Sequence, residues 1–415
     1  MQSPRTLALA ALAASRELAR LSPRRKNQAL DAMADALDAH RPALRAANAA
    51  DLADARAAAL PDALMDRLLL SDARIDAMIH GIRALEGLPD PIGEELAHWI
   101  RPNGLVISKR RVPIGVIAII YEARPNVTAD AAALCFKSSN AVILRGGHEA
   151  SRSNQAILDA LRAGAASAAV PPDAFQLLSE GGHEAVNELI RLEGLVDLVI
   201  PRGGERLIRA VAENARVPVI KHYKGVCHVY VDATADFAQA LDIVENAKCS
   251  RPGVCNAAEK VLVHADAAPA FLPLLAQRLS ARSVELRGDP ASRAIVPSML
   301  PATPEDWDAE YLSLVLTVGV VPSLDAAIDH INAHSSHHSD AILSTDPDAI
   351  ERFTSEVDSA CVYSNASTRF TDGGEFGMGA EIGISTDKLH ARGPMGLEEL
   401  TSYKYVVTGS GQIRP

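Results

Sequence analysis

The sequence predicts an α/β protein with two parallel α/β domains in tandem. Short apolar segments alternate with helical segments between residues 115 and 220, and a second series of the same kind covers residues 228–364. Continuous apolar strands separated by helices are typical of parallel sheets that are covered on both faces. The length of 415 residues, enough for two or three domains, agrees with this architecture.

Composition limits the classes of partner. Hydrophobic residues make up 48% of the chain and charged residues 22%, as in soluble globular proteins. The 41 basic residues are outnumbered by 52 acidic ones, so the net charge of -11 offers no basic surface to nucleic acid. No apolar run reaches the roughly 18 to 20 residues that a membrane-spanning helix needs. We therefore expect neither a nucleic-acid partner nor a membrane partner.

Residues 1–95 are predicted to be helical, because Ala, Leu, Asp and Arg dominate and prolines interrupt the pattern at intervals. The segment TLALAALAA at residues 6–14 could belong to a cleaved signal peptide. It continues directly into Arg16, Glu17 and Leu18, where polar and apolar residues follow helical spacing, so we favour an amphipathic helix.

A β-hairpin is predicted at residues 99–113. Two short extended runs flank Asn103-Gly104, and Asn-Gly is a strong signal for a hairpin turn. A last β-rich stretch, residues 400–407, could pair with this hairpin or with another subunit.

The two alternating series give the order of strands and helices, and ligands are expected at the carboxyl ends of the strands. The first series has strands at 115–120, 141–145, 175–178, 196–200 and 218–220, with helices at 127–138, from 151, at 182–192 and at 204–214. The second has strands at 228–232, 260–264, 312–321, 341–344 and 360–364, with helices at 236–248, 267–279 and 324–333.

Two glycine pairs follow predicted strands, although the GxGxxG fingerprint of dinucleotide-binding proteins is absent. They are Gly146-Gly147 after AVILR and Gly203-Gly204 after VDLVIPR. Glycine at these places would let a phosphate or ribose approach the backbone at a helix N-terminus. Ordinary turns are the alternative, but Arg145 and Arg202 beside the pairs favour an anion.

The five cysteines are odd in number and lack CxxC spacing, which indicates neither a disulfide framework nor a zinc ribbon. A reducing cytoplasm is therefore the expected location. Cys255 lies in a Pro- and Gly-containing loop between a predicted helix and strand. If it begins a helix or turn, backbone dipoles would favour a nucleophilic thiolate. A buried structural cysteine is the alternative, which the loop position and the neighbouring Arg251 disfavour.

Four histidines lie in HINAHSSHH, residues 330–338. His330 and His334 are four residues apart on a predicted helix, as two ligands of one metal would be. The run contains no cysteine, and Asp340 is its nearby carboxylate. We therefore expect no metal site, and interpret these histidines as surface or substrate-facing residues.

Five long segments carry a resemblance to a known family. They are VPIGVIAIIYEARPNVTADAAALCFKSSNAVILRGG, KHYKGVCHVYVD, NAKCSRPGVCNAAEKVLVH, SSHHSDAI and EFGMGAEIGISTDKLHARGPMGLEELTSYKYV. Together they resemble the γ-glutamyl phosphate reductases, a divergent branch of the aldehyde dehydrogenase superfamily. The resemblance implies an aldehyde dehydrogenase-like fold. Its parts would be a Rossmann-like NADP-binding domain (1–97 and 114–226), a catalytic domain (227–395) and a small oligomerisation β element (98–113 and 396–415).

The resemblance also implies an activity. This is the NADPH-dependent reduction of L-glutamate 5-phosphate to L-glutamate 5-semialdehyde with release of phosphate, the second step of proline biosynthesis from glutamate. The product would cyclise to 1-pyrroline-5-carboxylate. Cys255 matches the catalytic thiol of the superfamily and would form a thioester. Asn126 matches an asparagine whose amide, with the backbone N–H of that cysteine, holds the developing oxyanion.

For the cofactor, NADPH, the resemblance implies a site that includes both glycine pairs, Gly146-Gly147 and Gly203-Gly204. Glu310 matches a glutamate that binds the nicotinamide ribose. Many superfamily members have Lys-Pro-x-Glu where this chain has Arg145-Gly146-Gly147-His148, so the acid that would hold the adenosine ribose is missing. A 2′-phosphate is then tolerated, and Arg145 can pair with it.

The resemblance bears on the fate of the thioester as well. Many members hydrolyse it with a glutamate in a Glu-Leu-Gly-Gly motif, whereas this chain has His222-Tyr223-Lys224-Gly225 and no carboxylate there. An enzyme that discharges its thioester with hydride does not need that base. The substrate requires cationic or hydroxyl-bearing loop residues, for which the candidates are Arg251, Ser367, Thr368 and Arg369.

The implied partners are the small-molecule substrate and further copies of the chain, in a dimer or tetramer, and coupling to glutamate 5-kinase is a further expectation. Two alternatives stay open. A hydrolytic or CoA-acylating aldehyde dehydrogenase is opposed by the missing glutamate. A catalytically silent scaffold is opposed by the retention of both Cys255 and Asn126.

Overall fold

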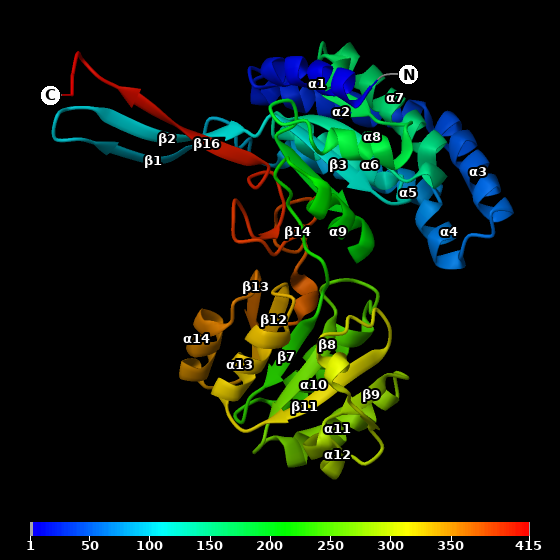
Figure 1. The fold of residues 1–415 in the computed structure, drawn as a ribbon, viewed down its shortest axis with the longest axis vertical. Coiled ribbons are helices and arrows are strands. Elements are labelled where there is room, and N and C mark those ends of the chain that lie inside the picture. Colours follow the sequence, from blue (N-terminus) through cyan, green and yellow to red (C-terminus); the bar gives the residue numbers. More distant parts are fainter. Residues whose placement is uncertain (1–2, 415) are drawn as a thin grey trace. The chain divides into compact units, whose positions relative to one another are not determined.

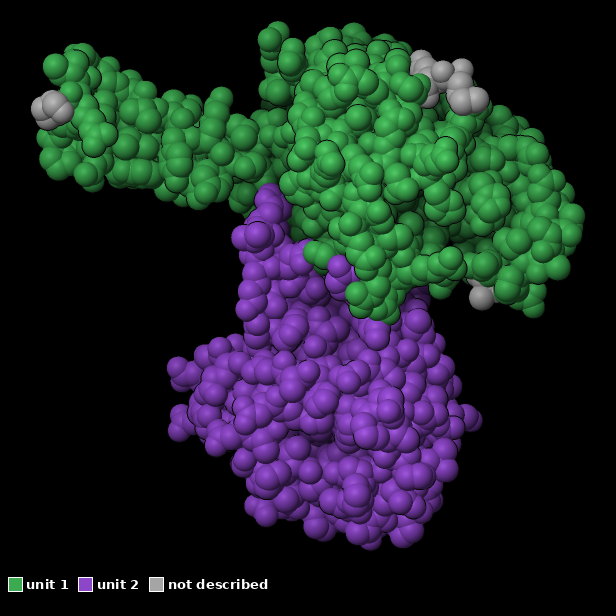
Figure 2. Space-filling model, in the orientation of Figure 1, with its two compact units in different colours: residues 1–221, 377–383, 395–415 green, residues 222–376, 384–394 purple. Residues whose placement is uncertain are grey.

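The computed structural model describes residues 3–414, and the chain divides into two compact units. Unit 1 comprises the residues up to 221 together with 377–383 and those from 395 onwards. Unit 2 comprises residues 222–376 and 384–394. Figure 2 shows the two units in different colours. Each unit has its own parallel sheet and its own buried core.

Unit 1 contains a four-stranded parallel sheet in the order β5-β4-β3-β6. Its strands are β3 (Val116–Tyr121), β4 (Ala141–Arg145), β5 (Phe175–Leu177) and β6 (Leu198–Arg202). The helices of the unit are α1 (Pro4–Leu18), α2 (Pro23–Ala39), α3 (Arg41–Ala57), α4 (Asp62–Leu68), α5 (Asp72–Ala84), α6 (Asn126–Lys137), α7 (Ser151–Ser167), α8 (Gly182–Leu189) and α9 (Glu205–Asn214). Every residue of β3 is buried, as expected for a central parallel strand.

The amphipathic helix predicted near the N-terminus is confirmed as α1. The side chain of Ser3 accepts a hydrogen bond from the Thr6 N–H and caps the helix, and proline occupies its first turn. Leu7, Ala11 and Leu18 are buried along one face, and the helix contacts β3, β4 and β5. The start of the chain therefore contributes to the core of unit 1.

A three-stranded antiparallel sheet extends from unit 1 as an arm (Figure 1). It consists of β1 (Glu95–Ile100), β2 (Val106–Pro113) and β16 (Thr401–Thr408), in the order β1-β2-β16. The turn between β1 and β2 contains Gly104 at a φ of 84°, a left-handed conformation that glycine adopts easily. The structure thus confirms the hairpin and pairs the C-terminal strand with it.

Unit 2 contains a seven-stranded parallel sheet in the order β10-β9-β11-β8-β7-β12-β13. Its strands are β7 (Cys227–Val231), β8 (Ala258–His264), β9 (Glu285–Gly288), β10 (Leu300–Pro301), β11 (Val315–Val321), β12 (Ser339–Leu343) and β13 (Cys361–Ser364). Its helices are α10 (Phe237–Cys249), α11 (Ala268–Ser280), α12 (Pro290–Ile295), α13 (Leu324–His334) and α14 (Pro347–Glu356). The short strands β14 (Ile384–Ser385) and β15 (Gly393–Pro394) pair antiparallel.

Helices cover both faces of the large sheet, and β7 shows how. Val229 and Val231 point to the face that packs on α10 and α11, whereas Tyr230 belongs to the cluster on the opposite face with α13 and α14. The Tyr230 ring stacks on Phe353 with centroids 6.3 Å apart. Because successive side chains of a strand point to opposite faces, a continuous apolar strand is buried on both sides.

The predicted α/β architecture is confirmed, with differences at some elements. Residues 218–220 do not form a strand: Val219 makes one isolated bridge to Val199, and Pro218 has no N–H to donate. The short strands β9, β10, β14 and β15 and the helices α12 and α14 were not predicted. No helix within residues 3–414 is both long and apolar enough to cross a membrane.

Candidate active site

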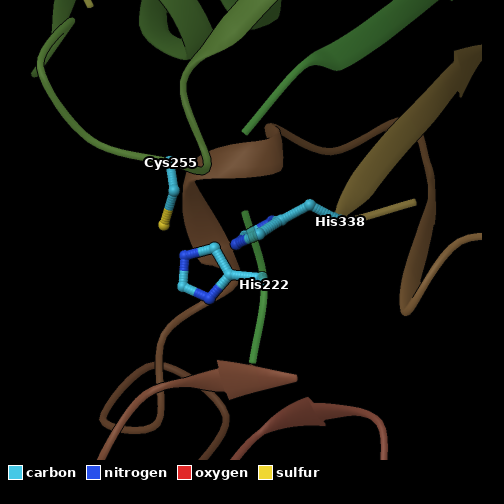
Figure 3. A group of neighbouring side chains, drawn as sticks. All are labelled: His222, Cys255 and His338. Carbon is cyan, nitrogen blue, oxygen red and sulfur yellow. The ribbon is translucent and has the colours of Figure 1, made fainter. Parts of the chain in front are cut away.

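Three reactive side chains converge in unit 2. His222 precedes β7, Cys255 precedes β8 and His338 directly precedes β12, and these three strands are neighbours in the sheet. One ligand atom from each side chain lies within 4.8 Å of the others. Figure 3 shows the three side chains directed towards one another.

This position corrects the expectation that ligands meet the carboxyl ends of the strands. In unit 2 the three residues lie at the amino ends, in connections that lead from a helix or loop into a strand. The carboxyl-end rule rests on helix N-termini that follow strands. Here the close approach of three segments that lead into strands creates the site instead.

Gly225 lies against the backbone of Cys255. A Cβ atom placed on this glycine would be 2.5 Å from the Cys255 carbonyl carbon and would overlap its Cα. The N–H of Gly225 donates to Glu310 Oε1 at 2.8 Å. Glu310 therefore holds the segment that supports Cys255, in the same unit.

Cys255 itself is half-buried in a turn between α10 and β8, not at the start of a helix. Its carbonyl oxygen accepts a hydrogen bond from the Cys227 thiol at 3.2 Å. Burial raises the pKa of the Cys227 thiol well above its usual range, so this neighbour stays a neutral donor. Of the two cysteines, Cys255 is the one open to a ligand.

His338 is completely buried, so the surface interpretation of this histidine was wrong. Its Nδ1 lies 2.8 Å from Ser339 Oγ, and Ser339 Oγ lies 2.5 Å from Thr371 Oγ1. Burial lowers the pKa of His338 to about 4, so the ring is neutral near pH 7. The burial of His338 could not be predicted from the sequence, because the run that contains this residue is polar.

His222 is half-buried and presents its imidazole to the same place. Its Nδ1 donates to the Ile384 carbonyl at 2.8 Å, because a carbonyl oxygen can only accept. In the neutral ring Nε2 is then the unprotonated nitrogen. The rings of His222 and His338 meet edge to face with centroids 5.4 Å apart. Figure 3 shows one nitrogen of His222 directed towards the sulfur of Cys255.

The other histidines of the run lie elsewhere. His330 and His334 are both on α13 with ring centroids 4.6 Å apart, and His334 Nδ1 lies 2.9 Å from Asp308 Oδ1. Neither belongs to the single group of three potential metal ligands found in the described part of the chain.

The four predicted substrate residues lie in two loops of unit 2. The hydroxyls of Ser367 and Thr368 are engaged within the protein: Ser367 accepts from the Arg369 N–H at 3.3 Å, and Thr368 donates to the Asn256 carbonyl at 2.7 Å. The Arg369 guanidinium donates to the side chain of Asn256, next to Cys255. Burial, and then the nearby Arg251, lower the pKa of Arg369. The two arginines are therefore the cationic members of this group beside Cys255.

Asn126 belongs to unit 1, where it begins α6 just after β3. Its Nδ2 donates to Asp130 Oδ2 at 3.0 Å. Burial raises the pKa of Asp130 to about 6. An amide nitrogen carries two hydrogens, so Asn126 retains a second donor for a ligand.

The two glycine pairs in unit 1 follow β4 and β6, which flank β3 in the sheet. The predicted placement at carboxyl ends of strands is confirmed there. A Cβ on Gly147 would lie 2.5 Å from Glu149 Oε2, and a Cβ on Gly203 would lie 2.7 Å from Glu122 Cδ. Arg145 is half-buried and donates to the Gly146 carbonyl at 2.9 Å. Glycine backbone and the Arg145 guanidinium, at the carboxyl ends of the two strands that flank β3, fit a phosphorylated nucleotide.

Two carboxylates near these glycines were missed. Glu122 Oε1 accepts from the Gly204 N–H at 3.0 Å, next to the start of α9. Glu149 stands one residue after the position at which the sequence argument found the acid missing, and its carboxylate lies beside Gly147. Their positions directly after β3 and after the first glycine pair were the available signals.

Comparison with known proteins identifies the family of the chain. Residues 5–296 match the model of the aldehyde dehydrogenase family. The chain belongs to this family. A γ-glutamyl phosphate reductase of Xanthomonas axonopodis pv. citri (strain 306) is 53% identical over 410 residues, which cover 99% of each chain. One from Thermoanaerobacter pseudethanolicus is 54% identical and covers 97% of this chain and 98% of its own.

A solved structure gives the same result for this aldehyde dehydrogenase family member. The crystal structure of γ-glutamyl phosphate reductase from Thermotoga maritima has a TM-score of 0.98 and 46% identity, with complete coverage of both chains. The predicted resemblance and the aldehyde dehydrogenase-like fold are confirmed. The protein is an oxidoreductase whose cofactor class is the pyridine nucleotides.

Replacing Gly225 tests the support of Cys255. Gly225→Ala should lower turnover at least about 100-fold, because the new methyl group must displace the Cys255 backbone and small misplacements of reacting groups cost about that much. Gly253→Ala, in the loop that carries Cys255, is the matched control, since its Cβ would meet its nearest atom at 3.7 Å. Turnover and the melting temperature are measured for both variants. Equal activity in the two folded variants would contradict the prediction.

Proposed function

We propose that this protein reduces L-glutamate 5-phosphate to L-glutamate 5-semialdehyde with NADPH and releases phosphate, as the second step of proline synthesis from glutamate. The relatives named above carry the name of this activity. The observation that carries the proposal is the group around Cys255, in which the neighbours of the thiol are two imidazoles instead of carboxylates. In this proposal unit 1 holds the cofactor and unit 2 holds the reacting cysteine.

The first step is attack by Cys255. Its thiol gives up a proton to the unprotonated nitrogen of His222, which is the half-buried member of the imidazole pair. The thiolate adds to the acyl carbon, the carbon–oxygen bond to phosphate breaks, and a thioester remains on Cys255. In this proposal the backbone N–H of Cys255 is a donor to the negative oxygen that forms during the attack. Asn126, in unit 1, matches the asparagine that supplies a second donor in the aldehyde dehydrogenase family.

The second step consumes the thioester. Bound NADPH would supply a hydride to the carbonyl carbon of the thioester. The carbon–sulfur bond then breaks, and Cys255 leaves as a thiolate that recovers its proton from His222. Gly146-Gly147 and Gly203-Gly204 would give the nucleotide phosphates access to the backbone, and Arg145 would pair with the 2′-phosphate. Glu310, whose carboxylate holds Gly225, matches the glutamate that would bind the nicotinamide ribose.

The proposed substrate carries a phosphate and an α-carboxylate, and both anionic groups are expected to bind cationic side chains. Arg251 and Arg369 supply them beside Cys255, since guanidinium groups bind such oxygens in pairs. Ser367 and Thr368 act through the loop: their hydrogen bonds to Arg369 and Asn256 fix where the Arg369 side chain begins.

The arm supports the proposal of a homo-oligomer. Its edge strands β1 and β16 have unpaired sides, and Ile100, Tyr405 and Val407 are each more than half exposed. Open edges and exposed apolar side chains favour pairing with another copy. A dimer or tetramer, a cytoplasmic location and coupling to glutamate 5-kinase complete the proposal.

Replacing the nucleophile separates the two cysteines around the proposed site. Cys255→Ala should abolish turnover and leave NADPH binding intact, because alanine cannot form a thioester and lies outside unit 1. Cys249→Ala, at the end of α10, should retain most activity. Steady-state rates and nucleotide titration by fluorescence measure both effects. Exchanged results for the two variants would show that the wrong cysteine had been chosen.

Cofactor preference tests Arg145. The wild type should have a higher kcat/KM with NADPH than with NADH, and Arg145→Ala should narrow the gap by about 1.5–3 kcal/mol, the worth of a hydrogen bond to a charged group. His148→Ala is the matched control, because this exposed neighbour makes no part of the proposed contact. Equal use of both cofactors by the wild type would refute the assignment of Arg145.

The fate of the thioester tests the reaction class. Oxidation of the semialdehyde without phosphate should stop after about one equivalent of NADPH per site, because general-base help is worth roughly 10²- to 10⁴-fold and no carboxylate belongs to the group around Cys255. Adding phosphate, or arsenate in its place, should restore continuous turnover. Rapid-quench measurement of NADPH and glutamate follows both cases. Sustained glutamate production without phosphate would mean that His222 or Lys224 activates water and would move the protein to the hydrolytic class.

A further inference from the structure

The two histidines beside Cys255 have the hydrogen-bond arrangement of metal-ligating imidazoles. In each ring Nδ1 is bound to a protein group: His222 to the Ile384 carbonyl and His338 to Ser339 Oγ, both at 2.8 Å. A carbonyl or hydroxyl on one nitrogen fixes the orientation of the ring and leaves the second nitrogen for a metal. Both rings therefore present Nε2 as the ligand atom that remains.

The burial of His338 Nε2 is a second indication of a ligand, independent of the hydrogen bonds made by Nδ1. The residue is completely buried, and Nε2 has no hydrogen-bond partner among the described residues. Leaving a buried polar atom unpaired costs free energy, which a bound ligand would recover. Figure 3 shows the end of the His338 ring directed towards His222 and Cys255.

The separations are close to those of a zinc site. The three ligand atoms lie within 4.8 Å of one another. Zinc bonds of about 2.0–2.3 Å in a tetrahedron place the ligand atoms about 3.5 Å apart, so the site closes with a movement of roughly 1 Å. Cys255 is half-buried in a turn, and a rotation of its side chain can supply this movement.

We propose that Cys255, His222 and His338 bind zinc, and that the bound metal blocks the reactive cysteine. A thiolate and two imidazoles form a ligand set that zinc prefers, whereas magnesium and calcium require oxygen ligands. Three protein ligands leave a fourth position for water. In binding, the sulfur–hydrogen bond is replaced by a sulfur–zinc bond and about one proton is released per metal.

The inhibitory effect follows from the electron pair of the sulfur. The pair that would attack a substrate is shared with the metal, so the cysteine loses its nucleophilic character until a chelator removes the zinc. Metal binding itself does not depend on the proposed substrate. Only the loss of turnover rests on the proposed function, so the experiment measures binding at the sulfur directly.

Alkylation with iodoacetamide tests the site in the full-length chain. Zinc at one equivalent should slow alkylation of Cys255 at least about tenfold, and magnesium at the same concentration should leave it unchanged. Cys249 is the internal control: it lies outside the group of three and should react at the same rate with and without zinc. Mass spectrometry of both cysteine-containing peptides gives the two rates, and added EDTA should restore the Cys255 rate.

Two variants connect the protection to the histidines. His222→Ala and His338→Gln should each remove the zinc protection and lower the zinc affinity measured by calorimetry at least about tenfold, whereas His334→Ala should keep both. His222 is half-buried, so its variant remains informative if replacement of the buried His338 prevents folding. Equal protection of Cys249, or full protection in the folded His222 variant, would overturn the proposed zinc site whether or not the protein reduces L-glutamate 5-phosphate.

Discussion

The packing of Gly225 on the backbone of Cys255 is the contact on which the site in unit 2 depends. Strands β7 and β8 are adjacent and parallel, with Cys227 opposite Ala258, so the segments that enter them must meet at one edge of the sheet. A side chain at Gly225 would separate those segments. Its absence brings His222, three residues earlier, to the sulfur of Cys255. The bond from the Gly225 N–H to Glu310 fixes the same segment from its other side.

Strands could be predicted from the sequence where their apolar runs are continuous and long. The strand at residues 141–145 was predicted with the bounds that the structure has. Four apolar residues are followed there by Arg145 and then by a glycine pair that ends the strand. Residues 285–301 were missed, since β9 and β10, the last two strands at one side of the sheet, are short and have few apolar residues. Pro218 shows a further limit of prediction from the sequence. The apolar pattern of residues 218–220 predicts a strand, but Pro218 lacks a backbone N–H, and the segment makes a single bridge between Val219 and Val199.

The candidate site was predicted only in part. Cys255 and the glycine pairs stood out because loop position and residue type suffice to mark them. His338 did not, because its place beside Cys255 depends on the strand order β8-β7-β12, which the sequence does not reveal. The same is true of Glu122, whose contact with Gly204 joins the ends of two strands that are neighbours in space and far apart in the chain. Residue types indicate which chemistry is available, whereas the order of strands in the sheet determines which residues lie close together.

The replacement of a carboxylate by imidazoles links the reaction to the response to metals. A carboxylate beside Cys255 would repel both a thiolate and an acyl phosphate, since like charges at close range raise the free energy of the charged forms. Neutral imidazoles avoid this repulsion, and burial keeps His338 neutral. His222 can still accept the thiol proton, because its Nδ1 is held by a carbonyl. The same nitrogen and sulfur atoms are ligands that suit zinc better than magnesium, so the three side chains that meet at Cys255 also form the ligand set of the proposed zinc site. The zinc affinity that we propose would therefore follow from the environment that, in the proposed function, suits the thiol to an anionic substrate.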